Sequence, residues 1–247
     1  MVSRQLVVSD LDGTLLGDAA ALARFAHWHE QVASRVALVY ASGRLWESVR
    51  ASVATTGLPP PDAVIGGVGT EVRCFRTGRD LVDWPAVLAT AGPPHWDAAA
   101  VRSALAGLTQ LELQPEVFQS ARKVSYFLLD ATADDLQGID ALLRHHGLAC
   151  ELVYSSAEHL DVLPQGINKG TAVRRLAAEW GIGAESIIVC GDTANDLAMF
   201  QQGFRGVVVA NARDELKRLA GQERVYLAES SHAAGVLEGV LHWLGHS

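Results

Sequence analysis

Two aspartates, Asp10 and Asp12, lie two residues apart at the end of an apolar run in the stretch VVSDLDGTLLGD, residues 7–18. Carboxylates this close repel each other, and burying either one is costly unless a cation or a proton compensates. Asp10 could act as a nucleophile towards phosphorus, with Asp12 as the general acid and base. Gly13 would let the chain turn sharply behind them. The alternative that this stretch alone leaves open is an Asp-Gly turn followed by a helix cap.

Two further candidates for phosphate contact are a hydroxyl after an apolar run and a lysine at the start of a predicted helix. Ser42 and Gly43 follow the apolar run VALVYA. A hydroxyl beside an exposed N–H at a helix start suits a phosphate oxygen, and a plain helix cap is the alternative. Lys169 falls in the first turn of a predicted helix, where the helix dipole disfavours a positive charge by ~0.3–1 kcal/mol. A lysine that reaches into an acidic pocket explains this placement better than a surface lysine does.

Three further polar residues, Asp192, Asn195 and Asp196, come just after the apolar run SIIVC. A turn with a helix cap would explain each of them singly. Ligands of doubly wound sheets, however, bind at the carboxyl ends of the strands, where all these motifs fall. Asp10, the backbone carbonyl of Asp12 and Asp192 would give an all-oxygen site of the kind that Mg2+ accepts. Asp196 is a further candidate ligand.

Apolar runs rich in β-branched residues alternate with segments of helical period. Such alternation implies parallel strands joined by crossover helices, so we expect an α/β fold with a doubly wound, mainly parallel sheet. The composition changes over residues 79–163, which we expect to form an inserted α+β cap, while 1–78 and 164–247 form the core domain. The expected strands are 5–9, 36–40, 63–67, 186–190, 206–210 and 224–228 in the core, and 123–130, 150–156 and 159–163 in the cap.

Composition excludes several classes of function. A net charge of −8 over 247 residues, without a cluster of Lys and Arg, argues against a surface for nucleic acid or an anionic membrane. No stretch approaches the ~18 apolar residues of a membrane span, and we expect a soluble, cytoplasmic protein. The three cysteines are expected to be reduced packing residues. The nine histidines form no ligand pattern, and we expect them to be solvated.

In order and spacing, the four motifs resemble those of the haloacid dehalogenase-like (HAD) phosphohydrolases: DxDGT, then Ser or Thr, then Lys, then GDxxND, with a large cap inserted between the second and the third. Within this superfamily the chain is most similar to the sucrose-phosphate phosphatase group, of which mannosylfructose-phosphate phosphatase is a close relative. The likeness covers nearly the whole chain, most weakly between residues 79 and 120. Beyond the motifs it extends to PDAVIGGVGTEV, KVSYFL, VYSSAEHLDVLPQGINKG, RGVVVANARDEL and SSHAAGVLEGVLHW.

The resemblance implies Mg2+-dependent hydrolysis of a phosphate monoester through an aspartyl-phosphate intermediate. It also implies a role for particular residues of this sequence. The implied residues are Asp10, Asp12, Ser42 and Lys169 for catalysis; Ser42, Gly43, Lys169 and Asn195 for phosphate binding; Asp10, Asp12, Asp192 and Asp196 for the metal; and Gly69, Thr70, Glu71, Lys123, Asp161 and Asn168 for the sugar. Trp84 and Trp96 could stack on a sugar face, although core or hinge packing is the favoured interpretation.

The identity of the sugar phosphate stays open. Sucrose 6-phosphate is favoured, mannosylfructose phosphate is the alternative, and glucosylglycerol or mannosylglycerate phosphates are also compatible. The synthase that makes the substrate is a candidate partner. Two non-enzymatic alternatives are a phospho-acceptor receiver-like domain, which would need neither the cap nor Asp12, and a sugar-phosphate-binding module, which a missing motif residue would favour. No GxGxxG follows the first strand, which argues against dinucleotide binding.

Overall fold

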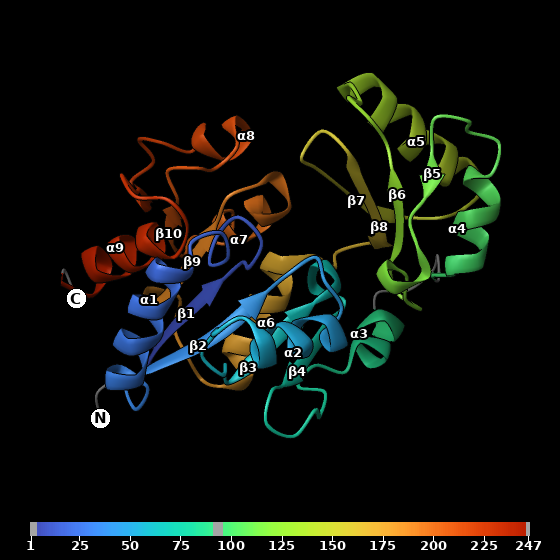
Figure 1. Ribbon diagram of the computed structural model, residues 1–247. Helices are drawn as coiled ribbons and strands as arrows, with labels where there is room; N and C mark the ends of the chain where they lie inside the picture. Colours follow the sequence, from blue (N-terminus) through green and yellow to red (C-terminus); the bar gives the residue numbers. More distant parts are fainter. Residues whose placement is uncertain (1–3, 91–95, 246–247) are drawn as a thin grey trace. The chain divides into compact units, whose positions relative to one another are not determined.

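The computed structural model describes residues 4–90 and 96–245 (Figure 1). The chain divides into two compact units, each described here by itself. The core unit comprises the described residues up to Val82 and from Lys169 onwards, and the cap unit comprises Asp83–Asn168. The boundaries expected from the sequence were 78/79 and 163/164. Within the described residues, no helix is long and apolar enough to cross a membrane.

The core unit contains a seven-stranded sheet in the order β11-β10-β9-β1-β2-β3-β4. Every neighbouring pair is parallel except β3 with β4, which form an antiparallel hairpin. The three central strands β9, β1 and β2 are buried almost throughout, as expected for strands covered on both faces. The strands span Gln5–Ser9 (β1), Val36–Ala41 (β2), Ala63–Gly66 (β3), Glu71–Cys74 (β4), Ile187–Gly191 (β9), Arg205–Val208 (β10) and Val225–Leu227 (β11).

Helices pack on this sheet and on one another. Helix α1 contacts α9, and α6 contacts α7 (Figure 1). Asp18 caps α1 by accepting hydrogen bonds from the N–H groups of Ala20 and Ala21, which satisfies two otherwise unpaired donors at the helix start. The core helices span Ala19–Val32 (α1), Trp46–Thr55 (α2), Lys169–Glu179 (α6), Leu197–Phe200 (α7), Asp214–Lys217 (α8) and His232–Gly245 (α9), with short 3-10 turns at Gly67–Gly69 (η1), Ala184–Ser186 (η3) and Ala194–Asp196 (η4).

The cap unit is an antiparallel four-stranded sheet in the order β5-β6-β8-β7, with helices that pack on it. Its core includes Val101 and Leu105 of α4, Ile139 and Leu143 of α5 and Val162 of β8. The sequence predicted β6, β7, β8 and α5 but not α3, α4 or β5. The elements span Trp84–Thr90 (α3), Ala98–Leu105 (α4), Glu112–Leu113 (β5), Glu116–Phe118 (η2), Val124–Phe127 (β6), Ala133–His145 (α5), Cys150–Ser155 (β7) and His159–Pro164 (β8).

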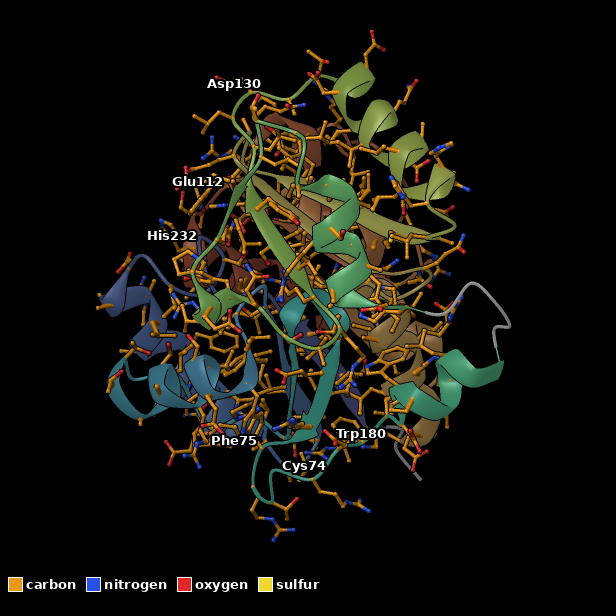
Figure 2. The ribbon with its side chains drawn as sticks, turned by 90° about the vertical axis from the view of Figure 1, so that its right-hand side faces the viewer. Cys74, Phe75, Glu112, Asp130, Trp180 and His232 are labelled. Carbon is orange, nitrogen blue, oxygen red and sulfur yellow. The ribbon has the colours of Figure 1, made fainter. Side chains whose placement is uncertain are left out.

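The tryptophans and cysteines that the sequence predicts to be packing residues have environments that agree with this prediction. Trp84 is buried, and Trp96 packs against the cap core while its indole N–H donates to the Ala121 carbonyl, which agrees with the packing interpretation. All three cysteines are free thiols; Cys150 and Cys190 are buried, and Cys74 is half-buried (labelled in Figure 2).

The expectation that the histidines are solvated is wrong for one of them. His29 is buried on α1, where its ring stacks on Phe25 with the ring centroids 6.5 Å apart. Its Nε2 has no hydrogen-bond partner among the described residues. The burial follows from helical periodicity, because residue 29 lies one turn beyond Phe25 on the face of α1 that packs inward. His95 and His246 lie outside the described residues.

Burial makes His29 a source of pH-dependent stability. Burial is the main cause that lowers its pKa below the ordinary 6.5, so the folded protein holds the ring neutral while the unfolded chain protonates it. Stability is therefore lost as the pH falls from about 6.5 through the lower folded pKa. We predict that His29→Phe removes this component. Urea unfolding at several pH values should show wild-type stability falling relative to the variant on acidification; a constant difference would contradict the prediction.

Candidate active site

Two neighbouring parallel strands, β1 and β9, bring the acidic motifs together. They pair with Ser9 opposite Cys190, so the residues that follow them, Asp10 and Asp192, emerge at the same edge of the sheet. The Asp10 N–H donates to the Cys190 carbonyl at 3.0 Å, which continues the ladder to the edge of the site. The structure thus places both motifs at the carboxyl ends of their strands, which is the location that the sequence predicts.

Lys169 joins these strands to α6, of which it is the first residue. It is fully buried, and its Nζ donates to Asp10 Oδ1 at 2.7 Å, Asn195 Oδ1 at 2.8 Å and Asp196 Oδ1 at 2.7 Å. An ammonium has three donors, so all of them are used. The other carboxylate oxygen of Asp196 accepts from the N–H groups of Asp192 and Thr193, which closes the turn η4 around the lysine.

The cluster carries an excess of negative charge. Burial raises the pKa of Asp10 well above its ordinary value, and Asp196 and Asp192 raise it further, while Lys169 offsets this only in part. Burial, reinforced by Asp196, raises the pKa of Asp192 to about 7. Burial alone would lower the pKa of Lys169, but the carboxylates of Asp10 and Asp196 outweigh it and hold that pKa above its ordinary value. Three carboxylates around one ammonium therefore favour a bound cation.

The carboxylates also have oxygens to offer such a cation. One oxygen each from Asp10, Asp192 and Asp196 lies within 4.8 Å of the others. Both oxygens of Asp196 accept hydrogen bonds from Lys169 and from backbone, whereas Oδ2 of Asp10 and Oδ2 of Asp192 accept none from the described residues. Free carboxylate oxygens suit Mg2+, which binds through one or two carboxylates and keeps several waters. The residues present thus fit a magnesium ion, which Asp10 and Asp192 would hold.

The turn after β1 is tied to the acidic cluster. Thr14 is buried, and its hydroxyl donates to Asp192 Oδ1 at 2.8 Å, so the two strand ends hold each other. Gly13 adopts φ +81°, and a Cβ at this position would collide with the Asp192 carboxylate. Only glycine satisfies both the left-handed backbone and the close approach. The sharp turn predicted from the Asp-Gly sequence is therefore required by the packing of a side chain that lies 179 residues further along the chain (192 − 13).

Asp12 does not belong to this cluster and pairs with Arg44, which the sequence analysis had not singled out. Arg44 Nε donates to Asp12 Oδ2 at 2.7 Å, and its Nη2 contacts Oδ1. A third guanidinium N–H donates to Ser52 Oγ at 2.8 Å, which fixes the arginine against α2. The Asp12 side chain is 51% exposed, so it is reachable from solvent where Asp10 is not. Only the position of Arg44 behind Ser42-Gly43 could have signalled this pair.

Ser42 and Gly43 form the loop that follows β2. Ser42 is buried and its hydroxyl accepts from the Arg44 N–H at 3.1 Å, whereas α2 begins at Trp46 after an N-cap residue, Leu45, that makes no side-chain cap bond. The alternative that Ser42 caps a helix is therefore wrong. A Cβ on Gly43 would lie 4.0 Å from Asn195 Nδ2, so this loop borders the residues around Lys169.

Comparison with known proteins decides the family. A model of the sucrose-6F-phosphate phosphohydrolase family matches residues 3–244. The chain belongs to this family. It is 39% identical to mannosylfructose-phosphate phosphatase of Agrobacterium fabrum over 97% of this chain and 96% of that protein. It is 31% identical to sucrose-phosphatase 1 of Nicotiana tabacum, covering 98% of this chain but 59% of that longer protein.

A solved structure supports the same assignment. The sucrose-phosphatase of Synechocystis sp. PCC6803, in complex with sucrose and phosphate, superposes with a TM-score of 0.89 at 32% identity, over 98% of both chains. The expected HAD fold is thereby confirmed, and so is the expectation of a phosphatase that acts on sugar phosphates. The receiver-like and binding-module alternatives are not retained.

In this phosphatase, the sugar-contact candidates of the core unit lie on the loop between β3 and β4 and at the first residue of β4. Thr70 is buried, and its hydroxyl donates to the Gly67 carbonyl at 2.9 Å. Glu71 accepts the Trp46 N–H on Oε2 at 2.7 Å. Val68, between Gly67 and Thr70, has φ +58°, a strained conformation for a β-branched residue. The loop, which includes Gly69, is held by the bond of Thr70 to Gly67 and by the bond of Glu71 to α2. A sugar contact by these residues stays a prediction.

Two candidates of the cap unit, Lys123 and Asp161, form a buried polar network with Ser125 at β6 and β8. Ser125 lies opposite Asp161 in the register, and its hydroxyl donates to Asp161 Oδ1 at 2.6 Å. Lys123 donates to the same oxygen at 2.8 Å, to Ser125 and to the Phe118 carbonyl at 3.0 Å, so its three donors are used. Asp161 Oδ2 accepts no hydrogen bond from the described residues. Asn168 donates to Glu151 Oε1 at 3.0 Å. Their contact with a sugar also stays a prediction.

Removal of the buried Lys169 ammonium should destabilise the fold. We predict that Lys169→Met lowers the free energy of unfolding by about 3–5 kcal/mol, because it leaves Asp10 and Asp196 buried without their cation. Urea unfolding of the purified variant, without divalent metal, measures this change. Lys217→Met is the matched control, since that lysine on α8 makes no ion pair among the described residues. Equal stability of the two variants would show that the Lys169 charge is not needed to bury the carboxylates.

Proposed function

We propose that this phosphatase hydrolyses a disaccharide phosphate whose phosphorylated unit is fructose, in a Mg2+-dependent reaction that passes through an aspartyl phosphate. The observation that carries the proposal is the contact of the buried Lys169 ammonium with Asp10 beside two further carboxylates. HAD phosphatases generally use Mg2+. When bound by Asp10 and Asp192, the metal would neutralise charge on the phosphate and on the attacking carboxylate.

Asp10 is the nucleophile in this proposal. An oxygen of its carboxylate forms a bond to phosphorus while the bond from phosphorus to the sugar oxygen breaks, giving the aspartyl phosphate and a sugar alkoxide. Repulsion between a carboxylate and a phosphate charge at ~4 Å costs about 4 kcal/mol at an effective dielectric constant of 20. Lys169 offsets part of this repulsion from the buried side of Asp10. Ser42 and the Gly43 N–H hold the equatorial oxygens as their charge redistributes.

Asp12 handles the protons in both steps. In its protonated form it gives a proton to the departing sugar alkoxide and becomes a carboxylate. In that form it takes a proton from the water that attacks phosphorus, which releases inorganic phosphate and frees Asp10. The exposed position of Asp12 suits this exchange with substrate and water. Arg44 contacts both carboxylate oxygens, so it orients the Asp12 side chain.

Removal of the nucleophile should abolish turnover without harm to the fold. In Asp10→Asn the amide keeps an oxygen that can accept from Lys169, but it cannot form the phosphorylated intermediate. We predict no phosphate release above a no-enzyme control, with an unfolding midpoint no lower than that of the wild type, since the variant buries one charge fewer. Measurable turnover by the variant in the presence of Mg2+ would contradict the assignment of Asp10.

Two disaccharide phosphates are candidates, each for its own reason. The family model and the solved relative bound to sucrose support sucrose 6-phosphate, which the sequence analysis also favoured. The higher identity to mannosylfructose-phosphate phosphatase, 39% against 31% and 32%, supports mannosylfructose phosphate. A cytoplasmic location and association with the synthase that makes the substrate stay predictions from the sequence.

A substrate panel tests the proposal directly. We predict that kcat/KM for at least one of sucrose 6-phosphate and mannosylfructose phosphate exceeds that for fructose 6-phosphate by about tenfold or more, because every 1.4 kcal/mol of binding to the second sugar gives that factor. Phosphate release with Mg2+ is the measurement. Comparable values for all three esters would mean that the second sugar is not recognised, and the enzyme would be a general sugar phosphatase.

A further inference from the structure

The turn that carries Asp12 is held from a part of the chain that the mechanism above does not use. The carbonyl of Gly13 accepts a hydrogen bond from Asn211 Nδ2 at 2.7 Å and lies 3.1 Å from His232 Nδ1. A carbonyl can only accept, so this ring nitrogen of His232 carries its hydrogen. Both donors belong to the core unit, one in the loop after β10 and the other at the start of α9 (His232 is labelled in Figure 2).

The two donors form one connected structure. Asn211 Oδ1 accepts the His232 N–H at 2.9 Å, so the same amide holds both the Gly13 carbonyl and the backbone of the histidine. His232 adopts φ +53°, a left-handed conformation that is uncommon outside glycine and in which asparagine, aspartate and histidine are the residues most often found. Its ring also fills the space beside Gly17, where a Cβ would collide with it. Strain held by surrounding contacts is typical of functional positions.

The contact has a direct geometric consequence for the proton-transfer residue. Gly13 follows Asp12, and Thr14 already ties the next position to Asp192. With the Gly13 carbonyl also fixed, the turn is anchored on both of its sides. Asp12 itself is 51% exposed, and its side chain contacts only Arg44 through hydrogen bonds in the described structure. Its aim towards the leaving group therefore depends on Arg44 and on the orientation of the backbone turn that carries it.

We propose that Asn211 and His232 are positioning residues that set the orientation of Asp12 for protonation of the leaving group. The inference rests on the proposed function, in which Asp12 is the general acid. A positioning role of Asn211 and His232 can be distinguished by experiment from a merely structural role in docking α9. A structural defect lowers kcat/KM with every substrate. A misplaced general acid lowers kcat/KM only for esters whose leaving group needs a proton, because kcat/KM covers the steps up to the release of that group and not the later hydrolysis of the aspartyl phosphate, in which Asp12 is the base.

The test compares two kinds of ester in the presence of Mg2+. One is the disaccharide phosphate that the wild type hydrolyses faster, whose alkoxide needs protonation; the other is p-nitrophenyl phosphate, whose phenolate departs without it. The variants are Asn211→Ala, His232→Ala and the conservative His232→Asn, which keeps a donor near the Nδ1 position and tolerates positive φ. Asp12→Asn is the reference for loss of the acid, and His27→Ala, an exposed histidine on α1, is the matched control.

We expect Asn211→Ala and His232→Ala to lower kcat/KM for the sugar ester at least about tenfold, a part of the 10²–10⁴-fold that general acid catalysis contributes, and to change that for p-nitrophenyl phosphate far less. His232→Asn should restore most of the loss, and His27→Ala should match the wild type. Equal losses with both esters, or full activity of both alanine variants, would overturn the inference.

The reference variant separates this inference from the proposed function. If Asp12→Asn shows no selective loss with the sugar ester, the general-acid role of Asp12 itself fails. If Asp12→Asn shows the selective loss and the alanine variants do not, only the positioning role fails. If the wild type hydrolyses neither disaccharide phosphate, the substrate proposal fails, and fructose 6-phosphate, which also releases an alkoxide, takes the place of the sugar ester in the same comparison.

Discussion

The buried ammonium of Lys169 is the interaction on which the site depends. An unpaired charge in a sheet interior would cost several kcal/mol, and the acceptors Asp10, Asn195 and Asp196 satisfy all three of its donors. These acceptors come from the end of β1 and from the turn after β9, while the lysine comes from α6. The three segments must therefore meet at one edge of the sheet before the charge can be buried, so the fold and the site form together.

The charge balance around this lysine explains why a phosphatase site can be so acidic. One ammonium faces three carboxylates, and the pKa values of Asp10 and Asp192 are raised by burial first and by the neighbouring carboxylates second. A site with this excess repels a phosphate ester by itself. It is suited to act with a divalent cation, which adds the positive charge that both the protein and the substrate lack. The acidity that looks unfavourable for an anionic substrate is thus the feature that recruits the missing charge.

The sequence could predict those features that leave a local pattern of residue types, and it could not predict contacts between residues far apart in the chain. The strands that end at Asp10 and Asp192 carry their own apolar pattern, and the rule for parallel sheets then places their ends together. His29 was predictable from helical period with Phe25, and a fuller use of that pattern would have found it buried. The contacts of Arg44 with Asp12 and of His232 with Gly13 span 32 and 219 residues and have no local pattern, so they required the structure.

In the cap, too, the sequence did not predict the contacts that two candidate sugar-binding residues make. Lys123 and Asp161 were expected to contact sugar, yet each is buried and bonded to the other across β6 and β8. All the donors of Lys123 are used, so a direct bond from it to a sugar hydroxyl would break an existing charged hydrogen bond. Asp161 keeps one carboxylate oxygen without a partner in the described structure. Lys123 and Ser125 thus hold the Asp161 carboxylate in place, while a sugar contact by Asp161 stays a prediction.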